Sequence, residues 1–125
     1  MSSLVGKQLT AGYGGVDIIK DIDLAVNEGE IVVIVGPNGA GKSTAMKALL
    51  GMLNLTSGSV EYSEKEITTM LPQNRINLGL AFVPQTQNVF TGMTVEENLE
   101  MGGFLREDNI KHTINDIFDL FPILK

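Results

Sequence analysis

The fold is decided by nine consecutive residues, Gly36-Pro37-Asn38-Gly39-Ala40-Gly41-Lys42-Ser43-Thr44. They match the spacing G-x-x-x-x-G-K-[ST] of a phosphate-binding loop without a gap. The run before the loop, Glu30–Val35, is short and rich in β-branched apolar residues, which predicts a strand buried on both faces. The residues after the loop predict a helix that begins near Lys42. Strand, glycine loop and helix therefore follow one another in the order that such a loop requires.

The residue types in this loop suit a nucleotide triphosphate. The three glycines carry no Cβ, so the backbone can take positive φ angles and bring its N–H groups close to phosphate oxygens. We expect Lys42 to contact the β- and γ-phosphates, Ser43 to bind Mg²⁺ and Thr44 to hold a further phosphate oxygen. The alternative is a glycine-rich turn that caps an ordinary helix. A lysine and a hydroxyl residue at fixed offsets after the second glycine favour the nucleotide site.

The remaining pattern predicts an α/β fold. Alternation of apolar and polar residues predicts antiparallel strands at Leu4–Ala11 and Ile22–Val26, and further strands are expected at Ser59–Tyr62, after a turn at Thr56–Gly58, and at Leu80–Val83. Besides the helix after the loop, helices are expected at Pro72–Asn77, from the capping box at Thr94–Glu97 to about Met101, and at Ile110–Phe121.

Composition limits the classes of function. A chain of 125 residues with 43% apolar residues supplies one core. The net charge of −6, from 15 acidic and 9 basic residues, argues against nucleic-acid binding, which needs clustered lysine and arginine. The absence of cysteine excludes disulfides and thiolate metal sites. Neither a signal peptide nor a membrane span is expected, which predicts a cytoplasmic protein that reaches the membrane only through a partner.

Three features together resemble the N-terminal half of an ABC-transporter ATPase subunit. They are Tyr13 in a glycine turn, the loop at 36–44, and the run LGLAFVPQTQNVFTGMTVEENLEMGGFL at 78–105. Within that superfamily, the stretches VPQTQNVF and TVEENLEMG are most similar to the shorter ATPase of branched-chain amino acid importers. The resemblance implies a truncated P-loop NTPase fold: an antiparallel β region at 1–30, a P-loop core at 31–88 and the start of a helical subdomain at 89–125.

The resemblance also implies roles for two residues outside the loop. Tyr13 matches the aromatic residue that stacks on adenine, and the alternative is a tyrosine that packs at a strand end. Gln85 matches the glutamine whose side-chain oxygen reaches Mg²⁺ and the attacking water, and the alternative is an ordinary loop residue. The implied catalytic residues are thus Lys42 and Gln85, and the implied metal ligands are Ser43 and Gln85. The implied cofactors are ATP and Mg²⁺.

Partners follow from the same resemblance. The segment from Val89 to Phe121 is expected to receive a cytoplasmic helix of the transmembrane permease, with exposed apolar positions near Phe90 and Met93 in contact. A second ATPase subunit, identical or paralogous, is expected to complete the transporter. His112 is expected to be exposed rather than a ligand or base. The acids at 96, 97, 100, 107 and 108 are expected to form a solvated surface.

Several elements of the family pattern do not occur in these 125 residues. They are the acidic residue and glutamate at the end of a later apolar strand, a downstream histidine, and the Leu-Ser-Gly-Gly signature. The resemblance therefore implies a fragment, about half the family's usual length, that binds nucleotide better than it hydrolyses it. It also places a strand that is missing here between 31–35 and 80–83, which predicts marginal stability or association with another chain.

Three functions are compatible with the sequence. The leading one is an ATP-binding subunit, ATP-hydrolysing when complete, of an ABC importer for branched-chain amino acids. The second is a nucleotide-binding or permease-docking module without turnover. The third, a soluble ABC-type ATPase of DNA repair or translation, is disfavoured by the acidic balance and by the short spacing between Lys42 and Gln85.

Overall fold

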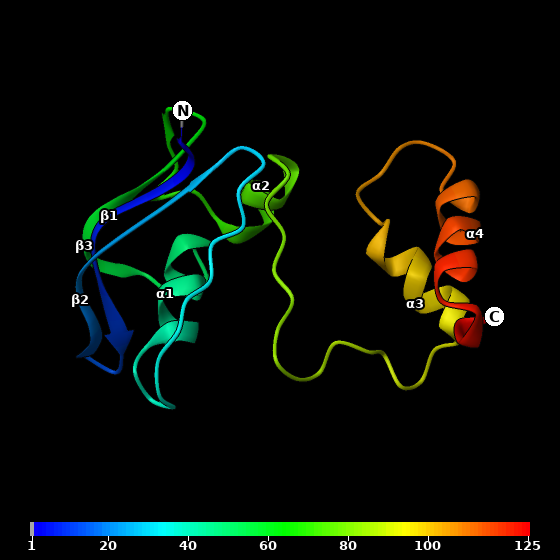
Figure 1. Cartoon of the computed structure of the whole chain (residues 1–125), viewed down its shortest axis with the longest axis horizontal. Helices are drawn as coiled ribbons and strands as arrows, with labels where there is room; N and C mark the ends of the chain where they lie inside the picture. The colour runs from blue at the N-terminus through cyan, green and yellow to red at the C-terminus, as the bar shows by residue number, and fades with distance from the viewer. Residues whose placement is uncertain (1) are drawn as a thin grey trace. The chain divides into compact units, whose positions relative to one another are not determined.

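The computed structural model describes residues 2–125, which fall into two units. One unit ends at Phe82 and the other spans Val83–Lys125 (Figure 1). The first unit contains the β-sheet and the predicted phosphate loop, and the second contains helices joined by loops. Within residues 2–125, no helix has the length and apolar character needed to cross a bilayer.

The first unit is built on one antiparallel sheet with the strand order β2-β1-β3-β4. The strands are β1 (Ser2–Tyr13), β2 (Val16–Asn27), β3 (Leu55–Tyr62) and β4 (Lys65–Glu66). Gly14 and Gly15 turn the chain from β1 into β2 with φ angles of 58° and 80°, a backbone that glycine adopts without strain. The two strands predicted at Leu4–Ala11 and Ile22–Val26 are confirmed, and both are longer than predicted.

Four register shifts interrupt the pairing of β1 with β2, and two of them lie at Gln8 and Asp21. Gln8 and Asp21 take the left-handed backbone conformation there, with φ angles of 48° and 51°. The N–H of Gln8 donates to Asp23 Oδ1 at 2.7 Å, and the N–H of Asp21 donates to Thr10 Oγ1 at 3.1 Å. Side-chain oxygens thus accept hydrogen bonds from the N–H groups of Gln8 and Asp21, which stabilises the bulge at each residue.

Gly58 lies inside β3, and the turn predicted at Thr56–Gly58 is wrong. Its φ is 97°, and a Cβ at this position would lie 2.4 Å from the carbonyl oxygen of Gln8. Glycine is required here because the backbone of β1 bulges towards β3. The strand therefore begins at Leu55 instead of Ser59, and the glycine marks a close backbone approach where a turn was predicted.

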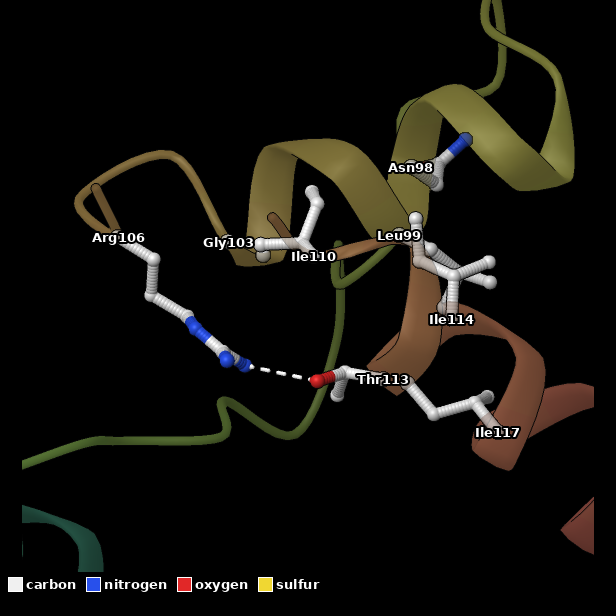
Figure 2. A pocket seen from close by; sticks show the side chains of 9 residues that line it. Asn98, Leu99, Gly103, Arg106, Ile110, Thr113, Ile114 and Ile117 are labelled. Atoms are coloured by element: carbon white, nitrogen blue, oxygen red, sulfur yellow. Dashed lines mark hydrogen bonds between the residues drawn. The ribbon is translucent and has the colours of Figure 1, made fainter. Parts of the chain in front are cut away.

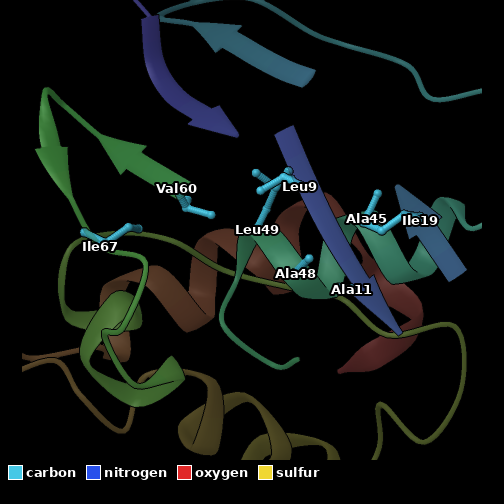
Figure 3. Close-up of a cluster of buried hydrophobic side chains, with 8 residues drawn as sticks. All are labelled: Leu9, Ala11, Ile19, Ala45, Ala48, Leu49, Val60 and Ile67. Carbon is cyan, nitrogen blue, oxygen red and sulfur yellow. The ribbon is translucent and has the colours of Figure 1, made fainter. Parts of the chain in front are cut away.

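Helix α1 (Lys42–Leu49) packs on the sheet and closes the core of the first unit (Figure 3). Its buried face presents Ala45, Ala48 and Leu49. The residues opposite are Leu9 and Ala11 of β1, Ile19 of β2, Val60 of β3 and Ile67 after β4. All eight side chains are at most 8% exposed. Burying side chains of this size contributes about 1.5–3 kcal/mol for each large one, so the packing of α1 on the sheet holds the phosphate loop in place.

Two predicted buried strands are wrong. Residues 30–35 form no strand, and Ile31, Val33 and Val35 are 90%, 73% and 84% exposed. Residues 80–83 also form no strand, and Val83 is exposed. A strand buried on both faces needs strand neighbours, and within residues 2–125 no strand pairs with either of these two segments.

Helix α2 (Pro72–Asn77) is confirmed at the predicted bounds. It buries Arg75, whose side chain is 2% exposed. The guanidinium donates hydrogen bonds to the carbonyl oxygens of Leu49 at 2.7 Å, Met70 at 2.9 Å and Thr68 at 3.0 Å. Because Leu49 is the last residue of α1, Arg75 ties the C-terminal end of that helix to the chain around α2. Burial lowers the pKa of Arg75.

The second unit contains α3 (Val95–Gly102), α4 (Lys111–Leu120) and the 3₁₀-helix η1 (Pro122–Leu124). The capping box is confirmed: Thr94 Oγ1 accepts from the N–H of Glu97, and Glu97 Oε2 accepts from the N–H of Thr94. Gly103 caps the C-terminal end of α3, close to the predicted end near Met101. The last helix ends before Pro122, also as predicted.

Candidate functional site

The phosphate loop enters α1 through glycines with a left-handed backbone. Gly39 and Gly41 have φ angles of 85° and 98°, and Gly41 is the N-cap of α1. The N–H of Ala40 donates to the carbonyl oxygen of Pro37 at 3.2 Å, which forms a tight turn before the helix. Such a turn directs successive N–H groups towards one concave surface, which is how backbone amides hold an anion.

The glycine at position 41 also permits close packing on the sheet. A Cβ there would lie 2.7 Å from Ile19 Cγ2 of β2, which is too close for any real contact. Gly39, in contrast, has open space where a Cβ would stand, so its need for glycine comes from the φ angle and not from crowding. Gly41 is therefore required by both conformation and packing.

Lys42 spans the loop that precedes it. Its Nζ donates to the carbonyl oxygen of Gly36 at 2.6 Å and to that of Pro37 at 2.9 Å. An ammonium group has three donors, so one remains for another acceptor at the loop. The first turn of α1 contains no acidic residue, and the positive end of the helix dipole and the ammonium group both favour an anion here.

The two hydroxyl residues that follow differ in exposure. Ser43 is exposed, so its hydroxyl is accessible to a cation or a ligand. Thr44 is 6% exposed and lies on the buried side of α1. The side chains from Gly36 to Thr44 thus place one cation and one accessible hydroxyl at the start of the helix, which suits a phosphate with a bound Mg²⁺.

Tyr13 lies at the end of β1 in the same unit as the loop. The residue is 48% exposed, and Lys47 Nζ of α1 lies over its ring at 5.9 Å from the ring centroid. The structure therefore brings Tyr13 to the helix that begins at the phosphate loop. No local pattern in the sequence reports the contact between Lys47 and Tyr13, because it joins residues 34 positions apart.

Gln85 lies in the second unit, whereas the phosphate loop lies in the first. It is exposed, in a segment without regular secondary structure. The side chain of Asn88 donates from Nδ2 to the carbonyl oxygen of Pro84 at 2.8 Å and so closes a short loop around Gln85. Residues 85–88 form neither helix nor strand.

An apolar pocket of about 380 Å³ lies beside the start of α1. Leu24, Val32, Met46 and Leu49 are among the residues that line it, and Lys42 is the charged residue of the lining. Its apolar walls offer few hydrogen-bond partners to a triphosphate, so the loop and not this pocket suits the anion. Sequence analysis missed the pocket because three separate segments form it.

A second pocket, of about 260 Å³, lies between α3 and α4 (Figure 2). Ile110, Ile114 and Ile117 supply apolar lining, while Arg106 Nη1 donates to Thr113 Oγ1 at 3.2 Å at its edge. Arg106 also pairs with Asp108. The hydrogen bond from Arg106 lowers the pKa of the Asp108 carboxyl, and the same bond raises the pKa of Arg106. Both groups lie at the surface, so this pair orders the loop more than it stabilises the fold.

Loop residues before α3 are fixed by Asn98. Its Oδ1 accepts from the N–H of Phe90 at 2.8 Å, and its Nδ2 donates to the carbonyl oxygens of Phe90 at 3.0 Å and Thr94 at 2.8 Å. Phe90 and Met93 themselves are 53% and 42% exposed. His112 is exposed beside Asp116, with 3.6 Å between Nε2 and Oδ2, as predicted for a surface histidine.

Comparison with known proteins identifies related chains. The ABC transporter family matches residues 19–124. A probable branched-chain amino acid transport ATP-binding protein from Archaeoglobus fulgidus is 40% identical over 119 residues, which cover 94% of this chain and 50% of that protein. A high-affinity branched-chain amino acid transport ATP-binding protein from Pseudomonas aeruginosa is 39% identical over 114 residues, 90% of this chain and 49% of that protein. The chain thus spans about half the length of these curated relatives.

Relatives with other named substrates also match. A lipopolysaccharide export system ATP-binding protein from Escherichia coli is 32% identical over 108 residues, covering 86% of this chain and 45% of that protein. Among solved structures, a nucleotide-free ATP-binding cassette from an ABC transporter has a TM-score of 0.75 at 30% identity, over 87% of this chain and 43% of its own. The ADP conformation of an ATP-binding cassette of an ABC transporter has a TM-score of 0.74 at 30% identity. The match covers 94% of this chain and 45% of that one.

Proposed function

This chain belongs to the ABC transporter family, and we propose that its loop Gly36–Thr44 binds the phosphates of Mg-ATP. One observation supports this most: Gly39 and Gly41 take positive φ angles directly before α1, with the Lys42 ammonium across the same loop. Backbone amides and a helix N-terminus supply the partial positive charge that a triphosphate requires. Lys42 adds charge-assisted hydrogen bonds, each contributing about 1.5–3 kcal/mol.

Four side chains receive roles in this proposal. Lys42 holds the β- and γ-phosphates, Ser43 gives an oxygen ligand to Mg²⁺, and Tyr13 stacks on the adenine ring. Gln85 is proposed as an oxygen ligand of Mg²⁺ and as the group that would orient the attacking water. ATP supplies the phosphoryl group that is transferred to water, while the chain binds and orients the reactants.

Hydrolysis is proposed for the complete subunit. Phosphoryl transfer depends on several groups at once, and the loop offers a cation and hydroxyls but no carboxylate to orient water. We expect these 125 residues to bind Mg-ATP more readily than they hydrolyse it. A measured turnover equal to that of the complete subunit would contradict this expectation.

The proposed partners are a membrane permease and a second ATPase subunit. Relatives named as transport ATP-binding proteins, from two organisms, support a subunit that acts with a transporter. Phe90 and Met93 offer exposed apolar contacts, and Asn98 fixes the backbone that carries them. Through such a permease the protein would lie on the cytoplasmic face of the membrane without inserting into it.

Branched-chain amino acids are the proposed cargo, because both relatives near 40% identity carry that name. Deleting the gene in its host should reduce uptake of labelled leucine, isoleucine and valine. Uptake of an unrelated solute such as glycerol 3-phosphate provides the control. Normal leucine uptake with a defect in another transported compound would overturn this assignment but leave ATP binding unaffected.

Isothermal titration with Mg-ATP tests the phosphate site. We expect Lys42→Ala to weaken binding by ~10- to 100-fold, at 1.4 kcal/mol per tenfold change. Lys65→Ala is the matched control, because Lys65 is an exposed lysine of β4 in the same unit. Equal ATP affinity in wild type and Lys42→Ala would refute the assignment of the loop.

A further inference from the structure

The contact between Lys47 and Tyr13 joins the end of β1 to the last turn of α1. Lys47 Nζ lies over the Tyr13 ring at 5.9 Å from its centroid, within the range of a cation–π interaction. Tyr13 is followed by Gly14 and Gly15, and neither glycine has a side chain that restrains the ring. The ammonium group of Lys47 lies over one face of the ring.

The geometry leaves the ring available to a ligand. Tyr13 is 48% exposed although Lys47 covers one side, so a flat base has aromatic surface left on which to stack. A ring that is already oriented loses less conformational freedom when a base binds, and the affinity rises accordingly. Lys47 can therefore act on a bound base through Tyr13 without touching it.

Lys47 is also fixed in relation to the phosphate loop. Lys42 is the first residue of α1 and Lys47 lies in its last turn, so five residues separate them along one helix, about 7.5 Å of rise. The two lysine side chains make different contacts. Lys42 donates hydrogen bonds to the carbonyl oxygens of the loop, whereas the ammonium of Lys47 lies over the Tyr13 ring. One rigid helix thus sets the position of the phosphate contact and of the aromatic ring together.

We propose that Lys47 is a positioning residue for the purine base of the bound nucleotide, acting through the Tyr13 ring. This inference rests on the proposed nucleotide site. A lysine near a helix C-terminus also interacts favourably with the helix dipole, independently of Tyr13. The two roles differ in a measurable way, because only the positioning role depends on the presence of the aromatic ring.

A double-mutant cycle on Lys47→Met and Tyr13→Ala tests the proposal. The dissociation constant of each variant is measured by titration with Mg-ATP and with inorganic tripolyphosphate, which has the phosphates but no base. We expect Lys47→Met to weaken ATP binding about two- to fivefold in the wild-type background, the size expected of an exposed cation–π contact. In the Tyr13→Ala background we expect no further loss, and tripolyphosphate binding should be unchanged.

Lys47→Arg is the conservative control. It keeps a cation over the ring and should retain wild-type ATP affinity, and circular dichroism verifies that every variant is folded. If Lys47→Met reduces ATP affinity equally in the wild-type and Tyr13→Ala backgrounds, the proposal is overturned. Equal loss for ATP and tripolyphosphate also overturns it, because that result indicates a general charge effect.

Failure of the proposed function has a different signature. If wild type binds neither Mg-ATP nor tripolyphosphate, the phosphate site and this inference are both wrong. If wild type binds both and Tyr13→Ala changes neither affinity, the phosphate site stands. The positioning role of Lys47 is then refuted alone.

Discussion

Lys42 donates a hydrogen bond of 2.6 Å from its Nζ to the carbonyl oxygen of Gly36, and so links the two ends of the phosphate loop. The same ammonium group donates to Pro37. These hydrogen bonds hold the Lys42 ammonium beside the position that a phosphate in the loop would occupy. Because the ammonium is oriented before the ligand binds, less conformational entropy is lost on binding, which raises the affinity.

Gly41→Ala should reduce both stability and ATP affinity. The φ angle of 98° is unfavourable for alanine, and the new Cβ would lie 2.7 Å from Ile19 Cγ2. We expect a loss of about 1–3 kcal/mol in the free energy of unfolding, measured in urea, from the strained backbone. Gly102→Ala is the control: it lies in α3, and its Cβ meets nothing within 4 Å. An equal effect at both positions would show that the geometry at Gly41 is not important.

Arg75→Met should destabilise the first unit. It preserves much of the side-chain volume but leaves the carbonyl oxygens of Leu49, Thr68 and Met70 without their guanidinium donors. Loss of buried hydrogen bonds of this kind costs about 1–3 kcal/mol, measured as the shift in urea unfolding. Arg106→Met removes an arginine whose ion pair lies at the surface and is screened by solvent, so we expect a smaller loss of stability there. If the free energy of unfolding falls less in Arg75→Met than in Arg106→Met, the structural role of Arg75 is contradicted.

The exposed segment 31–35 should promote self-association. Ile31, Val33 and Val35 are mostly exposed, and an exposed run of β-branched apolar residues is prone to pair with strands of another chain. We expect the apparent mass in analytical ultracentrifugation to rise with concentration, and Val33→Lys to reduce that rise. Val16→Lys is the control, since Val16 is an exposed valine at the start of β2. A monomer at all concentrations would refute this prediction.

The Arg106–Asp108 pair should respond to acid. The hydrogen bond from Arg106 holds the pKa of the Asp108 carboxyl below its usual range. Because the carboxyl pKa is depressed in the folded state, the pair stabilises the fold above the pKa of the unfolded chain. This stabilisation is lost as the pH falls through the pKa of the folded state. Carboxyl chemical shifts measured by NMR in an Arg106→Gln variant should give a higher pKa for Asp108. An unchanged titration would show that the two side chains do not pair in solution.

Local patterns predicted the elements with local causes. The capping box at Thr94 and Glu97 starts α3, Pro72 starts α2, and the glycine loop leads into α1 at Lys42. Each of these signals acts within a few residues, so the sequence itself contains the reason for the structure.

Features with distant causes were missed or predicted incorrectly. The apolar run at 31–35 predicts a buried strand, but burial depends on neighbours that local periodicity does not report. Gly58 predicts a turn by its residue type, whereas the structure uses it opposite the bulge at Gln8. The hydrogen bond from Arg75 to Leu49 spans 26 positions, and the fold alone brings these residues together.

In the proposed site, main-chain amides between Gly39 and Ser43 hold the phosphates of ATP. Titrating the ¹⁵N-labelled chain with Mg-ATP, while following amide resonances by NMR, tests it most directly. We predict that the amides of Gly39–Ser43 show the largest saturable shifts, and that Lys42→Ala weakens this response. Saturating Mg-ATP that leaves these amides unchanged would contradict the account.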